Sequence, residues 1–221
     1  YGEAYLKRTQ KPHPTLRDEI AAFIDLDFEG PLNKEGKRVF QTIKRKGDKQ
    51  NKVYTILNGK KVLIWDPVQL DSTGSTSTQG FAYTFDGERA GVSVQKSGAE
   101  ISTTYIIDTR TGKILYGPYE NLSGFQWTKD QQHAYFTIRG KEQIDNQLPL
   151  KTYWWKVGDP IEKATFIGTT SDAKNSFYFY DNRYSDVSFS GEGDFYSNNC
   201  YIHKTGTFDK GQLIYESKKS N

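Results

Sequence analysis

The sequence has one cysteine, no methionine and no apolar run of about 18 residues. A lone Cys200 forms no intrachain disulfide, so no disulfide framework holds the fold. Without a long apolar run the chain has no transmembrane helix, and the mean hydropathy of −0.77 agrees. We therefore expect a water-soluble protein, with cytoplasm and periplasm both open as compartments. Because the chain starts at Tyr1, we expect that a signal peptide or a longer polypeptide preceded it.

Neither sign of charge is in excess. The 30 Lys and Arg residues against 27 Asp and Glu residues leave a net charge of +3, which indicates neither a nucleic-acid nor a membrane partner. The densest basic run is Lys44-Arg45-Lys46. We interpret it as the solvated rim of a sheet, where lysines discourage edge-to-edge pairing.

A single helix is predicted near the start of the chain, over residues 15–26. Thr15 is its expected N-cap, Asp18 follows three residues later, and one face carries Leu16, Ile20, Phe23 and Ile24. Upstream, Lys11–Pro14 predicts an extended lead-in because proline disfavours helix at the residue before it.

From about residue 37 onward the pattern is typical of antiparallel strands. The runs 52–57 and 61–65 flank Asn58-Gly59, which favours the two positive φ angles of a type I′ hairpin turn. A second hairpin is predicted from the runs 103–108 and 113–116, which turn through Thr111-Gly112. The chain is therefore mainly β.

A turn motif recurs four times, as an apolar residue followed by a polar, acidic or glycine-containing reversal. Its copies are 32–37, 83–88, 127–132 and 189–194, at spacings of 51, 44 and 62 residues. One four-stranded propeller blade consumes about 40–50 residues. We therefore predict blades, each reversing at the motif between its innermost and second strands. A generic β-sandwich is the alternative.

Six segments, in the same order and spacing, resemble the N-terminal part of the prolyl oligopeptidase family of serine peptidases. They are Gly36–Phe40, Gln50–Tyr54, Val62–Pro67, Phe85–Ala90, Thr104–Lys113 and Phe125–Asp130. Three departures favour a divergent member: Val68 after Asp66-Pro67 in place of asparagine, Ser97–Glu100 in place of Gly-Ser-Asp-Trp, and Gln131 in place of a turn glycine.

The resemblance implies a partial β-propeller of about four four-stranded antiparallel blades after a short N-terminal helix. We expect a lead-in and helix over residues 1–30 and a propeller portion over 31–221, with blade starts near Leu32, Tyr83, Trp127 and Phe189. Four blades leave two open apolar flanks, so we also expect self-association, with the segment from Tyr184 to Tyr215 at one contact.

The resemblance implies that a complete relative would carry seven blades and an α/β-hydrolase domain with a Ser-Asp-His triad, with the propeller as a filter for short peptides. This chain has no Gly-x-Ser-x-Gly pentad, so we expect no catalytic residue in it and no cofactor. The resemblance implies a non-catalytic part that gates short proline-containing peptides, with Leu122 and Tyr184 as candidate pocket residues. A free-standing binding or scaffold protein is the alternative.

The other candidate sites have simpler interpretations. His13, His133 and His203 lie far apart and are assigned structural or surface roles; Cys200-x-x-His203 lacks the second ligand pair that structural zinc needs, so no metal is expected. Asp25, Asp27 and Glu29 alternate, which indicates one solvated face of an extended segment and not a calcium loop. The aromatic run Phe177–Tyr180 and Trp154-Trp155 predict core packing on one strand face, and a ligand platform on the other stays open.

Overall fold

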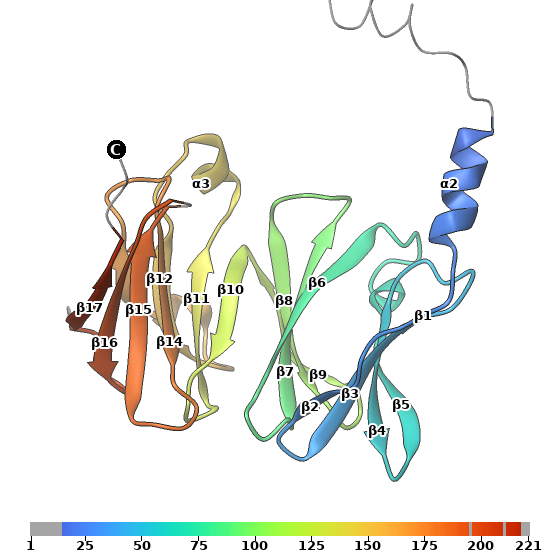
Figure 1. Ribbon diagram of the computed structural model, residues 1–221, viewed down its shortest axis with the longest axis horizontal. Helices are drawn as coiled ribbons and strands as arrows, with labels where there is room; N and C mark the ends of the chain where they lie inside the picture. Colours follow the sequence, from blue (N-terminus) through green and yellow to red (C-terminus); the bar gives the residue numbers. More distant parts are fainter. Residues whose placement is uncertain (1–14, 195, 210, 218–221) are drawn as a thin grey trace, which may run out of the picture.

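The structure is a computed structural model that describes residues 15–194, 196–209 and 211–217. Over these residues the chain forms four antiparallel sheets that lie side by side in chain order, with α2 projecting away from the first (Figure 1). The predicted mainly β partial propeller with a short N-terminal helix is thereby confirmed. The expected lead-in Lys11–Pro14, with His13, lies outside the described residues.

Each sheet is built from strands that follow one another in the chain. Sheet 1 contains β1 (Phe28–Glu29), β2 (Asn33–Glu35), β3 (Arg38–Lys44), β4 (Lys52–Leu57) and β5 (Lys60–Trp65). Sheet 2 contains β6 (Thr76–Tyr83), β7 (Arg89–Lys96), β8 (Ser102–Asp108) and β9 (Ile114–Glu120). Sheet 3 contains β10 (Leu122–Trp127), β11 (His133–Ile138), β12 (Lys151–Lys156) and β13 (Thr165–Thr169). Sheet 4 contains β14 (Ser176–Asp181), β15 (Val187–Gly193), β16 (Asn198–Lys204) and β17 (Gln212–Glu216).

The described helices are short and lie outside the sheets. They are α2 (Leu16–Ile24), α3 (Lys141–Asp145) and the 3₁₀ turns η1 (Pro67–Gln69) and η2 (Ile161–Lys163). In sheet 1, β1 and β2 pair with successive parts of β3, so together they form a first strand that is interrupted at residues 30–32.

Helix α2 begins after Thr15, as predicted, but it ends at Ile24 and not at residue 26, the Thr15 side chain makes no capping hydrogen bond, and the helix buries none of its residues. The hydroxyl of Thr15 donates to Glu19 Oε1 at 2.7 Å. The apolar face is exposed to solvent, with Phe23 at 78%. The base of the helix is fixed to the β3–β4 turn, because Lys44 Nζ donates to the Ile24 carbonyl at 3.2 Å.

The acidic residues after α2 also bind the β3–β4 turn. Asp25 accepts from the backbone N–H of Gly47 at 2.6 Å, and Asp27 accepts from that of Lys46 at 2.7 Å. Glu29 pairs with Arg45, whose side-chain hydrogen bond is the main reason that the pKa of Glu29 lies below its usual value. The alternating acids thus anchor the root of the helix to sheet 1.

The two predicted hairpins are confirmed. Asn58 and Gly59 have φ angles of 49° and 75°, and they join β4 to β5. In the second hairpin the Asp108 carboxylate accepts from the N–H groups of Arg110 and Thr111, which fixes the reversal from β8 to β9. Local turn chemistry therefore sets these two strand registers.

The first three copies of the repeated motif lie where their reversals were predicted, between the first and second strands of sheets 1, 2 and 3. The fourth copy, starting at Phe189, is misplaced. Residues 189–193 belong to β15, and the matching reversal in sheet 4 is 182–186. Gly191 and Gly193 are strand residues that resemble turn glycines in sequence, because glycine also occurs where side chains pack closely on a sheet.

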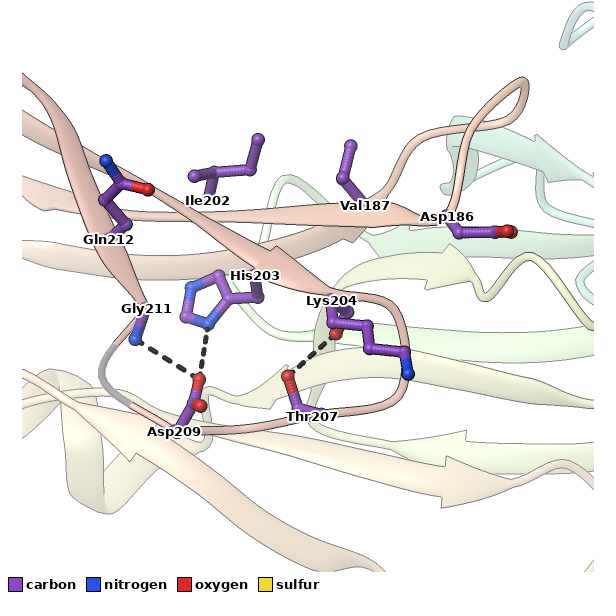
Figure 2. A pocket seen from close by; sticks show the side chains of 9 residues that line it. All are labelled: Asp186, Val187, Ile202, His203, Lys204, Thr207, Asp209, Gly211 and Gln212. Carbon is purple, nitrogen blue, oxygen red and sulfur yellow. Dashed lines mark hydrogen bonds and ion pairs between the residues drawn. The ribbon is translucent and has the colours of Figure 1, made fainter.

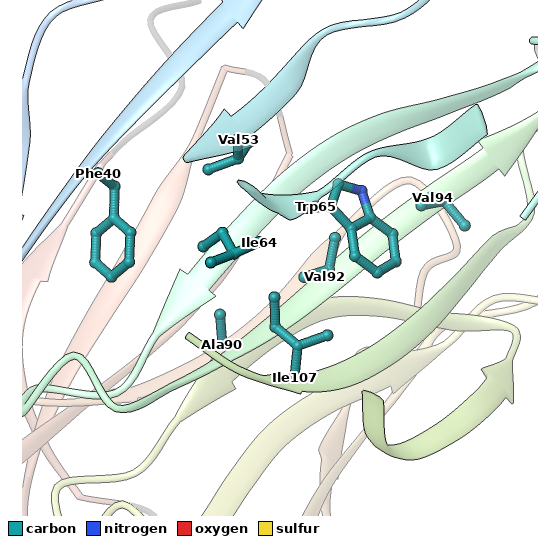
Figure 3. Packing of buried hydrophobic residues seen from close by; sticks show 8 residues of the cluster. All are labelled: Phe40, Val53, Ile64, Trp65, Ala90, Val92, Val94 and Ile107. Atoms are coloured by element: carbon teal, nitrogen blue, oxygen red, sulfur yellow. The ribbon is translucent and has the colours of Figure 1, made fainter. Parts of the chain in front are cut away.

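Apolar side chains fill the spaces between neighbouring sheets. The cluster between sheets 1 and 2 (Figure 3) contains Phe40, Val53, Ile64, Trp65, Ala90, Val92, Val94 and Ile107. The cluster between sheets 2 and 3 contains Ile106, Leu122, Phe125, Trp127, Ala134, Phe136, Trp155 and Val157. Sheets 3 and 4 meet through Tyr135, Phe179 and Phe208. Burial between adjacent sheets therefore stabilises the arrangement.

Small residues admit aromatic rings at two of these interfaces. A Cβ added to Gly91 in β7 would lie 2.5 Å from two ring atoms of Phe125 in β10. A Cβ on Gly168 in β13 would likewise collide with the ring of Phe177 in β14. In each case an aromatic residue of a first strand packs directly on backbone of the preceding sheet.

Candidate functional site

The reversals after the first strands of the four sheets come together at one end of the molecule. We call them the inner turns: residues 36–37, 84–88, 128–132 and 182–186. Two of them share a Thr-x-Asp pattern. The Thr84 hydroxyl donates to Asp86 Oδ1 at 2.7 Å, and the Thr128 hydroxyl donates to Asp130 Oδ1 at 2.6 Å. Each of these side-chain hydrogen bonds stabilises its reversal locally.

The carboxylate of Asp130 illustrates the electrostatics of such a turn. Partial burial acts to raise its pKa, but hydrogen bonds from Thr128, Gln132 and His133 outweigh this effect. The pKa therefore lies below its ordinary value. His133 sits 2.6 Å from Asp130 through Nδ1 and stacks on Trp154, which is the structural role predicted for it.

Neighbouring inner turns bind one another. The backbone N–H of Asp86 donates to Gln131 Oε1 at 2.7 Å, and the guanidinium of Arg89 donates to the Gln131 carbonyl. Gln131 holds a left-handed φ of 60° without being glycine. Its two contacts with the preceding turn offset the cost of that conformation, about 1 kcal/mol.

The turns of sheets 3 and 4 are joined through a buried carboxylate, Asp181. It accepts from the Lys129 N–H at 2.8 Å, the Tyr135 hydroxyl at 2.9 Å and the Ser188 hydroxyl at 2.7 Å. Burial is the main reason that the pKa of Tyr135 lies above its usual value, and the negative charge of Asp181 is the second reason. Tyr135 is therefore a permanent donor at neutral pH, and the Asp181 side chain has its acceptor positions filled by three donors.

Arg183 extends from the inner turn of sheet 4 to sheets that are not its neighbours. Its Nη1 lies 3.0 Å from Glu35 Oε2 in sheet 1, and its Nη2 donates to the Phe85 carbonyl of sheet 2 at 2.6 Å. The guanidinium also lies over the Phe85 ring, 5.0 Å from its centroid. The four inner turns thus form one connected polar cluster.

The two predicted pocket residues are not brought together. Leu122 begins β10 and is only 2% exposed, inside the cluster between sheets 2 and 3. Tyr184 is 88% exposed in the inner turn of sheet 4, which contacts Lys129, two residues past the far end of β10, through Ser185 and Asp186. A contact of either residue with a peptide stays a prediction.

A hydrogen-bonded Ser–His–Asp chain that sequence reasoning missed lies in sheet 4. His203 Nε2 lies 2.7 Å from Ser190 Oγ, and its Nδ1 lies 3.3 Å from Asp209 Oδ1. His203 and Asp209 line a hollow of about 880 Å³, and Figure 2 shows the two side chains facing each other. The sequence separations of 13 and 6 residues match no known motif, and only the register of β15 on β16 reveals the chain.

The Ser190–His203–Asp209 arrangement lacks the geometry of a nucleophile site. Ser190 is 3% exposed and lies within β15, paired with Phe179 on one side and Tyr201 on the other. A nucleophilic serine needs an exposed hydroxyl and free N–H donors for an oxyanion. The arrangement instead tethers Asp209 to the sheet through His203, and Asp209 also accepts from the Gly211 N–H at 3.3 Å.

The remaining candidates are separated by the fold. Cys200 and His203 lie three residues apart in β16 and so face opposite sides of the sheet. Cys200 Sγ lies 3.7 Å from the Tyr178 hydroxyl. Within the described ranges, no three His, Cys, Asp or Glu side chains gather in a way that could hold a metal ion. No helix in the described part of the chain is long and apolar enough to span a membrane.

The sequence matches the family model of the prolyl oligopeptidase N-terminal β-propeller domain over residues 1–203. No curated protein sequence matches the chain.

Several solved structures share the fold. A prolyl endopeptidase studied for the role of inter-domain dynamics in catalysis and specificity has a TM-score of 0.80 at 18% identity, over 92% of this chain and 32% of its own. Oligopeptidase B from Leishmania major has a TM-score of 0.74 at 14% identity, over 93% and 31%. Prolyl oligopeptidase B from Galerina marginata has a TM-score of 0.74 at 12% identity, over 99% and 34%. The chain thus spans about a third of the length of these structures.

Proposed function

The chain belongs to the prolyl oligopeptidase family, in its N-terminal β-propeller domain, and we propose that it is the non-catalytic propeller part of a serine endopeptidase. In this proposal it gates the access of short proline-containing peptides to a covalently linked α/β-hydrolase domain. The sequence contains no Gly-x-Ser-x-Gly pentad, which a nucleophile elbow needs. Among the described residues, the serine of the Ser–His–Asp arrangement is buried within a strand.

The observation that carries the gating proposal is the convergence of the inner turns. Arg183 in sheet 4 contacts both Glu35 in sheet 1 and Phe85 in sheet 2. Side chains therefore crowd the end of the molecule where the inner turns of the four sheets meet. A narrow centre admits extended peptides and excludes folded proteins. The proposal therefore assigns the chain a filtering role and assigns the chemistry to another domain.

Two assays test the proposal. The purified chain is incubated with a succinyl-Gly-Pro chromogenic peptide and with a fluorophosphonate label, and we expect neither turnover nor labelling. The parent gene is then sequenced beyond Asn221, and we expect about 400 further residues that include a strand followed by Gly-x-Ser-x-Gly. Labelling of the chain, or a reading frame without that pentad, would contradict the proposal.

The alternative is a free-standing binding or scaffold protein, and the outer face of sheet 4 favours it. We define this face as Tyr178, Tyr180, Phe189, Ile202 and Tyr215. These residues lie on the side opposite Phe179, which packs toward sheet 3. Tyr178, Tyr180 and Phe189 stack in sequence at 6.3 and 5.4 Å, and Tyr215 is 56% exposed.

The same face supports the proposal that the isolated chain self-associates through its terminal sheets. Exposed apolar surface costs about 25 cal/mol per Å², so a second copy that covers the face gains that free energy. The division of the chain into residues 1–30 and 31–221 likewise stays a prediction.

A further inference from the structure

Arg183 is the one described residue whose polar side-chain contacts span three sheets. It sits in the turn after β14, yet Glu35 lies 148 positions away in sequence and the Phe85 carbonyl 98 positions away. The side chains of Arg183 and Glu35 are 31% and 26% exposed, so both are largely shielded from solvent. Water and salt therefore screen this pair less than an exposed pair such as Arg139–Glu100, whose side chains are 42% and 63% exposed.

The apolar contacts between sheets do not by themselves fix the position of sheet 1 relative to sheet 4. Apolar side chains join sheet 1 to sheet 2, sheet 2 to sheet 3, and sheet 3 to sheet 4. The angle between sheets 1 and 4 is therefore the sum of three packed interfaces, and small rotations at each of them accumulate. A contact across the arc removes that freedom directly.

We propose that Arg183 is a latch that closes the arc of four sheets across its centre, with Glu35 and the Phe85 carbonyl as its two receptors. When the latch opens, sheets 1 and 4 separate at the inner-turn end. The consequence for peptide access rests on the proposed function, whereas the latch itself is a property of this chain.

The chemistry of the latch requires arginine. The planar guanidinium places one nitrogen on a carboxylate and another on a carbonyl while its face covers the Phe85 ring. Lysine presents a single charged point on a flexible stem, so it keeps the attraction to Glu35 but not both hydrogen bonds. The latch is therefore directional as well as electrostatic.

Distances between spin labels test the latch in the whole chain. With Cys200→Ser as background, Lys60→Cys in β5 and Glu216→Cys in β17 carry nitroxides on exposed positions of sheets 1 and 4. We expect Arg183→Met and Glu35→Gln to broaden the distance distribution and extend it to longer distances. Arg183→Lys gives an intermediate distribution, and raised salt broadens the parent distribution in the same direction.

A matched control separates the latch from general loss of charge. Arg139 pairs with Glu100 at 2.8 Å between the neighbouring sheets 2 and 3, at an exposed position, so Arg139→Met leaves the distribution unchanged. If Arg183→Met fails to fold by circular dichroism, Glu35→Gln and Arg183→Lys supply the same readout. Distributions that coincide with the parent in all folded variants overturn the latch. Peptidase assays do not enter this test, so failure of the gating proposal would be seen separately.

Discussion

The contact of Gly91 with Phe125 makes the packing between sheets 2 and 3 testable by one methyl group. Gly91 is buried in β7, and a Cβ there would stand 2.5 Å from two atoms of the Phe125 ring, where ordinary contact begins at 3.4 Å. The ring must therefore move by about 1 Å. Phe125 is 7% exposed and its ring meets Trp127 edge-on at 5.4 Å, so it has little room to do so.

We expect Gly91→Ala to lower the free energy of unfolding by about 1–3 kcal/mol, the usual cost of overpacking a core. At about 2–4 °C per kcal/mol for a chain of this size, the melting temperature falls by about 2–12 °C. Urea unfolding followed by tryptophan fluorescence and calorimetry measure the two quantities. Shortening the ring partner in Gly91→Ala/Phe125→Leu should recover part of the loss, as a positive coupling in a double-mutant cycle.

Gly80→Ala is the matched control, because Gly80 is also a strand glycine but has no atom within 4 Å of an added Cβ. This change should be neutral or stabilising by about 0.4–1 kcal/mol, since alanine restricts the unfolded chain. If Gly91→Ala proves as stable as Gly80→Ala, the ring does not pack on the β7 backbone and the arrangement of sheets 2 and 3 is wrong.

Three further predictions concern two carboxylates and the outer face of sheet 4. Tyr135→Phe removes a donor to the buried carboxylate at the end of β14 and should cost about 1–3 kcal/mol in urea unfolding, whereas an unchanged stability would place that carboxylate in water. Hydrogen bonds to Asp71, the largest contribution coming from Ser75 and the next from Thr73, hold the pKa of Asp71 below its usual value. The stabilisation that the Asp71 carboxylate provides is therefore present above about pH 4 and is lost as pH falls through the lower pKa of the folded protein. Asp71→Asn should accordingly flatten the decline of stability below about pH 4, and equal slopes for both proteins would refute this. Sedimentation equilibrium should show self-association of the chain that Tyr180→Lys with Tyr215→Lys abolishes; a monomer of 25.3 kDa at high concentration would instead mean that the terminal faces are already covered.

The elements that sequence predicted well are those fixed by local chemistry. Asn58-Gly59 specifies a turn whose two φ angles few other residues tolerate, and the helix begins directly after Thr15 as expected. The blade repeat was recognisable because Asp86 and Asp130 each follow a threonine by two positions. In the structure the hydroxyl of that threonine donates a hydrogen bond to the aspartate. The fourth reversal was missed because Asn182 and Arg183 replace that pattern, and a glycine pair in β15 resembled it more closely.

The polar clusters could not be predicted, since they depend on how distant strands are placed. Nothing in sequence joins Arg183 to Glu35, because their meeting follows from the sum of three interfaces between sheets. Ser190 and His203 meet only through the register of one hairpin. Leu122 was chosen by alignment to a pocket position, yet its side chain is enclosed by packing between sheets, a property that alternation within a single strand does not reveal.

The consecutive order of strands within each sheet has a consequence for biosynthesis. Within the described part of the chain every strand pairs only with strands of its own sheet, and the strands of each sheet follow one another in sequence, so each sheet can form soon after its last strand leaves the ribosome. Each new sheet covers the apolar face of the one before it and presents a fresh face of its own. During translation the aggregation-prone surface at the growing end is thus limited to the newest sheet, and the contact between Arg183 and Glu35 is among the last to form, 148 residues after translation of its first partner.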